Sequence, residues 1–186
     1  MAKPGGGPKD KPILIFSRDG WRLVASPVGA MEVPVWDIES RTRWLVKIDH
    51  REGLVWAALS ADGTRLVAAS YDDHASLWDV ETGRKLARFS GQFVGFLSAA
   101  ISPDKTRVAL GGDDGSLSVW DAQTGQQMAT FRGNSSAINF TLWDENGDTL
   151  ATVSGTDGLR IWRAPALAEI KETERSRGQA DTKVAR

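Results

Sequence analysis

The sequence predicts an all-β protein built from a repeated unit of short antiparallel strands. Trp36, Trp78, Trp120 and Trp162 follow one another at a constant step of 42 residues. Within each step, short apolar runs alternate with turn-forming segments rich in Asp, Gly, Ser and Thr. No stretch of the repeats places apolar residues at the helical period, so helices are not expected there.

The second repeat shows the expected order of elements. A first strand is predicted in the apolar run 54–59, and a second at 65–69 after an Asp-Gly turn. A third strand is predicted at 75–78 and a fourth at 85–89, with a Thr-Gly turn between them. Apolar residues run together in the first two strands but alternate with polar ones in the fourth. This contrast predicts buried inner strands and a half-exposed outer strand.

The turns repeat at the same step as the tryptophans. The segment 60–63, Ser-Ala-Asp-Gly, recurs as Ser-Pro-Asp-Lys at 102–105 and as Asp-Glu-Asn-Gly at 144–147. The Thr-Gly pair at 82–83 recurs at 124–125. Because many unrelated positions keep one step, the chain is predicted to be a repeat protein whose units stack on their neighbours.

A unit of about 42 residues, with four strands and a Trp-Asp pair at the end of the third, resembles the WD40 repeat of β-propellers. The Trp-Asp pair occurs at 36–37, 78–79 and 120–121, whereas Trp162 is followed by Arg163. The resemblance implies an incomplete ring of four-stranded antiparallel blades within residues 11–170. The implied blades are residues 11–49, 50–90, 91–132 and 133–170.

The resemblance also implies a hydrogen-bonded tetrad of His, Ser or Thr, Asp and Trp that braces a blade. The implied members are His50, Ser70, Asp72 and Trp78 in the second unit, and Asp114 and Trp120 in the third. Asp157 is the corresponding turn residue of the fourth unit. A buried carboxylate must accept hydrogen bonds, so these residues are expected to be structural rather than catalytic. The alternative, that His50 and Asp72 form a catalytic pair, is disfavoured.

Composition excludes several classes of protein. The 186 residues include no cysteine, which excludes disulfide scaffolds, Cys-ligated metal sites and cysteine nucleophiles. A formal net charge of -1 argues against nucleic-acid binding driven by bulk charge. No apolar run has the length of a membrane span, and no secretion signal is present, so a cytoplasmic protein is expected. With only two histidines, no His-rich metal site is expected, and no metal or cofactor is predicted.

Ring closure is the open question for such a fold. Propellers typically have four to eight blades, and the outer strand of the fourth unit would have to come from residues 164–168, a poor strand sequence. Residues 1–10 are expected to form a flexible leader, and 171–186 a charged tail. The favoured interpretation is the C-terminal part of a longer propeller. The alternatives are two chains that close an eight-bladed ring, and an open arc with exposed apolar faces.

The resemblance implies a non-catalytic scaffold that binds a protein or peptide. Candidate contacts come from the loops that precede the first strand of a unit or join its second and third strands. They are Arg51, Tyr71, His74, Phe93 and Asn134. The alternatives are a sensor or regulatory part of a longer signalling enzyme, such as a kinase, and a fragment of a propeller enzyme.

Overall fold

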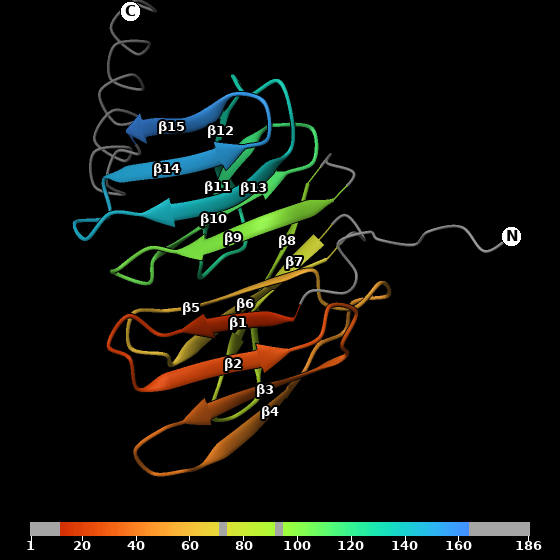
Figure 1. Cartoon of the computed structure of the whole chain (residues 1–186), viewed down its shortest axis with the longest axis vertical. Coiled ribbons are helices and arrows are strands. Elements are labelled where there is room, and N and C mark those ends of the chain that lie inside the picture. Colours follow the sequence, from red (N-terminus) through yellow and green to blue (C-terminus); the bar gives the residue numbers. More distant parts are fainter. Residues whose placement is uncertain (1–11, 71–73, 92–94, 164–186) are drawn as a thin grey trace, which may run out of the picture.

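The computed structural model describes residues 12–70, 74–91 and 95–163, which form four antiparallel sheets (Figure 1). The first sheet comprises β1 (Ile13–Phe16), β2 (Arg22–Ser26), β3 (Glu32–Asp37) and β4 (Arg43–Lys47), and the second comprises β5 (Trp56–Leu59), β6 (Arg65–Ala69), β7 (His74–Asp79) and β8 (Lys85–Ser90). The third sheet comprises β9 (Phe96–Ile101), β10 (Arg107–Gly112), β11 (Leu117–Asp121) and β12 (Gln127–Phe131). The fourth sheet comprises β13 (Ile138–Trp143), β14 (Thr149–Ser154) and β15 (Gly158–Arg163). The all-β prediction is confirmed, and the strands of the second sheet lie within two residues of the predicted ranges. The fourth strand predicted for the last sheet lies outside the described residues.

Each sheet is a meander in which strand order follows chain order. The first strands, β1, β5, β9 and β13, pack against one another in succession and form the inner edge of the assembly. From this inner edge the first sheet and the fourth sheet extend in opposite directions (Figure 1). The four sheets therefore form an arc of propeller blades. Among the described residues, no helix is long and apolar enough to cross a membrane.

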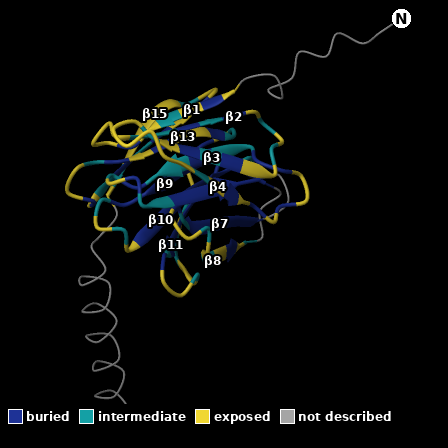
Figure 2. Cartoon of the chain, turned by 90° about the horizontal axis from the view of Figure 1, so that it is seen from below, coloured by how far each residue is buried: buried dark blue, intermediate teal, exposed yellow. Residues whose placement is uncertain are grey.

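The core is divided among three apolar clusters, each between two consecutive sheets, and Figure 2 shows the buried strands between exposed loops. The cluster between the first two sheets contains Val24, Val33, Val35, Leu66 and Trp78, among others. The next contains Val67, Leu77, Phe89, Val108 and Trp120, and the last contains Ala109, Leu117, Val119, Trp143 and Leu150. Among the described residues no sheet has a core of its own, so each blade is stabilised by its neighbours.

The turn between the first two strands explains the repeated Ser-x-Asp motif. The Ser60 hydroxyl donates to Asp62 Oδ1 at 2.6 Å and accepts the backbone N–H of Arg65 at 3.0 Å. The Thr64 hydroxyl donates to the same carboxylate oxygen at 2.9 Å. One carboxylate therefore closes the hairpin, which is why the motif recurs at the same step in the third blade.

The Asp of each Trp-Asp pair has a similar role at the other hairpin. Asp79 Oδ1 accepts the backbone N–H of Thr82 at 2.9 Å and its hydroxyl at 2.7 Å. These bonds favour the ionised carboxylate, so they lower the pKa of Asp79. The preceding Trp78 packs between sheets, so the pair combines a core side chain with a turn acceptor.

An arginine at the start of the second strand links each of the first three sheets to the next. Arg22 Nη1 donates to the carbonyl of Gly63 at 3.1 Å, and Arg65 Nη1 donates to that of Lys105 at 2.7 Å. Arg107 donates to the carbonyl of Gly147 in the same way. The fourth sheet has Thr149 at this position. Hydrogen bonds from charged donors are stronger than those between neutral groups, so these arginines reinforce the apolar contacts between blades.

The substitution Trp120→Ala should lower the free energy of unfolding by about 3–5 kcal/mol, because it opens a cavity between the second and third sheets. Trp120 is 3% exposed, and its ring lies 5.9 Å from that of Phe89. Urea unfolding followed by circular dichroism measures the change. The control is Trp21→Ala, which removes an indole that is 51% exposed. Equal losses in the two variants would contradict the assignment of Trp120 to the core.

Candidate functional site

The loops predicted to bind a partner gather along one end of the strands, on the right-hand side of Figure 1. They are the linkers between consecutive sheets and the turns between the second and third strands of a sheet. We call this surface the loop face. Its described segments are 27–31, 48–55, 113–116, 132–137 and 155–157, with Ser70, Gly91 and Gly95 beside the residues that are not described.

Backbone hydrogen bonds join the linkers of the loop face to the blades beside them. The N–H of Gly29 donates to the carbonyl of Leu54 at 2.6 Å, and the N–H of Leu54 donates to the carbonyl of Ala30 at 2.9 Å. The N–H of Phe96, in the third sheet, donates to the carbonyl of Ser70, in the second, at 3.2 Å. The loops are therefore held by backbone groups and not only by their side chains.

The third blade continues this network. The N–H of Asp113 donates to the carbonyl of Gly95 at 3.1 Å, and Asn134 Nδ2 donates to the carbonyl of Gly115 at 3.4 Å. Gly115 has a φ of 79°, and a Cβ atom there would lie 2.6 Å from the carbonyl oxygen of Asn134. Only glycine fits this turn without strain, because it needs a positive φ and a close approach of the linker.

In the fourth blade a carboxylate holds the linker to the turn between β14 and β15. Asp157 accepts the N–H of Ser135 at 2.6 Å and its hydroxyl at 2.8 Å. The Ser154 hydroxyl donates to the same carboxylate at 3.2 Å. The backbone N–H of Ser135 is the largest cause of the lowered pKa of Asp157. Asp157 thus stands at the turn position that the sequence assigned to it.

The structure divides the predicted contact residues into three groups. Arg51 is exposed on the linker between the first two sheets. His74 and Asn134 were expected in partner-facing loops, but both are buried, with 4% and 9% of their surfaces exposed. His74 begins β7 and stacks on His50, and Asn134 turns inward to Gly115, so neither presents an open side chain. Tyr71 and Phe93 lie outside the described residues.

The implied tetrad is only partly described. His50, Ser70 and Trp78 are buried in the second blade, whereas Asp72 lies outside the described residues, so this set stays a prediction. In the third blade, Asp114 and Trp120 belong to separate hydrogen bonds. Asp114 Oδ1 accepts the hydroxyl of Ser116 at 2.6 Å, and Trp120 Nε1 donates to the hydroxyl of Ser118 at 2.8 Å. Neighbouring serines thus satisfy both groups locally.

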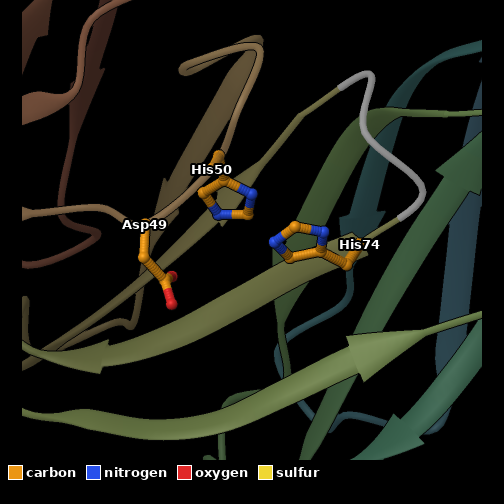
Figure 3. A group of neighbouring side chains, drawn as sticks. All are labelled: Asp49, His50 and His74. Carbon is orange, nitrogen blue, oxygen red and sulfur yellow. The ribbon is translucent and has the colours of Figure 1, made fainter.

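Asp49, His50 and His74 form the one group of potential metal ligands found among the described residues (Figure 3). Their ligand atoms lie within 4.8 Å of one another. The two imidazole rings are stacked, however, with centroids 4.5 Å apart and an angle of 19° between their planes. An imidazole binds a metal in its own ring plane, so two nearly parallel rings do not converge on one ion.

The carboxylate of this group has another partner. Lys85 forms an ion pair with Asp49 Oδ2. Desolvation raises the pKa of Asp49, but the hydrogen bond and charge of Lys85 outweigh it and lower the pKa below the usual value. The geometry therefore fits a ring stack beside an ion pair.

The inner strands line a half-open cavity of about 410 Å³. Its described lining is apolar apart from Thr141 and Arg18, and the guanidinium of Arg18 pairs with Glu145. Because Arg18 follows β1 and Glu145 follows β13, this ion pair connects the first sheet to the fourth. Within the described lining there is no His, Asp, Glu or Cys, so the cavity offers apolar surface rather than acid–base chemistry.

The linking arginines were not recognised in the sequence. Arg22, Arg65 and Arg107 recur close to the 42-residue step, and each stands first in its second strand. This periodicity could have identified the arginines. Their hydrogen-bond acceptors could not be identified from the sequence, because they are backbone carbonyls, which every residue has.

Asp157→Asn should lower the melting temperature at pH 7 and flatten its fall on acidification. The folded-state pKa of Asp157 is lowered, so the carboxylate stabilises the fold above its unfolded-state pKa of about 4 and loses this effect as the pH falls below that value. Thermal melts between pH 7 and pH 3 measure the slope. Glu52→Gln, at an exposed position of the loop face, is the control. An unchanged slope in Asp157→Asn would contradict the role of this carboxylate.

Comparison with protein families agrees with this architecture. The family model described as WD domain, G-beta repeat, matches residues 43–79, 83–121 and 125–163. Each match starts with the outer strand of one sheet and ends with the third strand of the next, so each repeat joins two blades. A search of curated proteins gave no match. The matches cover more than half of the chain, and the chain therefore belongs to the WD40 repeat family.

Proposed function

We propose that this chain is a non-catalytic scaffold that binds a protein or peptide on its loop face. WD40 repeats generally mediate protein–protein interactions, which supports the class of function. The observation that carries the proposal is the hydrogen-bonded loop network, which connects linkers and turns in all four blades. A surface fixed before binding loses little conformational entropy when a partner docks.

The chemistry of the described site residues supports a binding role over catalysis. The carboxylate of Asp157 accepts hydrogen bonds from Ser135 and Ser154, and that of Asp114 accepts one from Ser116. Such groups brace loops and are not poised for proton transfer. The arrangement of the sheets, with short turns on rigid strands, suits the display of side chains to a partner.

The double substitution Arg51→Ala with Phe93→Ala should weaken partner binding at least severalfold, because Arg and aromatic side chains dominate interface energies. An array of immobilised peptides of varied sequence, probed with the purified chain, identifies ligands for titration. The matched control is Arg84→Ala with Trp21→Ala, which removes an exposed Arg and an exposed aromatic from the opposite ends of the strands. Equal affinity of the test variant and the wild type would reject the loop face as the binding surface.

A further inference from the structure

We propose that two copies of this chain associate head to tail through the outer faces of their first and fourth sheets and close an eight-bladed ring. The sequence favours a fragment of a longer ring. A second copy is a partner that fits, because the two end faces are the two halves of the junction that already joins the blades within the chain.

The fourth sheet exposes a continuous apolar surface, which we call the trailing face. It consists of Phe140, Leu142, Ala151, Val153, Leu159 and Ile161. The register places these side chains on one side of the sheet, because Phe140 pairs with Val153 and Leu142 pairs with Ala151. Leu142, Leu159 and Ile161 are each more than 60% exposed. An apolar surface of this kind marks an interaction site.

The 42-residue step relates the trailing face to the equivalent face of the third sheet, whose contacts are described. The corresponding residues of the third sheet are Ser98, Ala100, Ala109, Gly111, Leu117 and Val119. In that sheet the same positions are covered by the fourth sheet. Ala109 and Leu117 pack in one cluster with Trp143 and Leu150, and the Ser98 hydroxyl donates to the carbonyl of Ile138 at 2.9 Å. The trailing face is therefore an unoccupied copy of a surface that receives a following blade.

The first sheet exposes the opposite half of the junction, which we call the leading face. It consists of Leu14, Phe16, Leu23, Trp36 and Ile38. The corresponding residues of the second sheet are Ala57, Leu59, Leu66, Trp78 and Val80, all of which pack against the first sheet. Trp78 is 6% exposed, whereas Trp36 is 39% exposed. The leading face therefore has the side chains that a blade inserts against the blade before it.

A second copy satisfies both faces at once. A partner must offer a leading face to one end and a trailing face to the other, at matching separation. A copy related by a two-fold axis does this where the four blades of each chain span half a turn, and the contact then closes rather than propagates. Figure 1 shows the first and fourth sheets extending in opposite directions, and Figure 2 places β1 and β15 on the same side of the molecule.

The junction between copies would differ from the internal junctions at one polar position. Arg22, Arg65 and Arg107 each donate to a carbonyl of the next sheet, whereas the fourth sheet has Thr149. The carbonyl that a fourth arginine would reach is that of Gly20 in the second copy, which corresponds to Gly63. The association therefore depends mainly on apolar contact, which makes it sensitive to single charged substitutions on either face.

Light scattering during size-exclusion chromatography of the full chain tests the proposal. The wild type should have twice the chain mass of 20.2 kDa. Ile161→Glu on the trailing face and Phe16→Glu on the leading face should each give a monomer, because each breaks both junctions of a homodimer. Both positions are more than half exposed, and circular dichroism checks that the variants fold. Met31→Glu, at an exposed position in a turn, is the control and should stay dimeric.

Mixing the two variants distinguishes head-to-tail pairing from other dimers. A mixed pair regains one intact junction, so the equimolar mixture should contain dimer at concentrations where each variant alone is monomeric. Thr149→Arg should lower the dimer dissociation constant about tenfold by adding a charged hydrogen bond to the carbonyl of Gly20, whereas Thr149→Gln should not. A monomeric wild type, open-ended polymers, a dimeric Phe16→Glu variant or a mixture without dimer would each overturn the proposal.

Discussion

The presence of apolar side chains on both faces of every sheet is the constraint on which the rest of this structure depends. A meander with apolar residues on its two sides cannot form a core alone, so it is stabilised by packing against neighbouring sheets. The three apolar clusters lie between sheets and not within them. Trp78 and Trp120 lie in these clusters, while the Asp that follows each of them accepts hydrogen bonds from a turn. The repeat is thus a unit of packing as well as of sequence.

The same constraint holds the described loops against the blades. Because consecutive sheets pack against one another, the linker that joins them is short and runs over the turns of the adjacent blades. Its backbone groups find partners there, as between Gly29 and Leu54 or between Gly95 and Asp113. Asp157 adds a carboxylate that holds Ser135 to the turn of the fourth blade. The described part of the loop face is therefore held by contacts to the blades beneath it.

The constraint also determines what happens at the two ends of the arc. The first and fourth sheets have the same two-sided apolar pattern as the inner ones, so each keeps one face without a neighbour among the described residues. The exposed Phe16 and Ile161 stand where the inner blades have buried Ile101 and Val119. An arc of repeated blades thus contains both halves of its own junction, which is the physical basis for the proposed association between copies.

The sequence alone determined the repeat and the strand order, since these depend on local pattern and on a step that needs no coordinates. It also identified Asp157 as the turn acid of the fourth blade. Tertiary structure decided which polar side chains are accessible. His74 and Asn134 stand in loop positions by sequence but are buried, because a ring stack and a backbone carbonyl hold them inward. It also revealed the linking arginines, whose acceptors are carbonyls about 40 residues away in the next blade. Contacts between blades depend on how the sheets stack, and no local pattern encodes that arrangement.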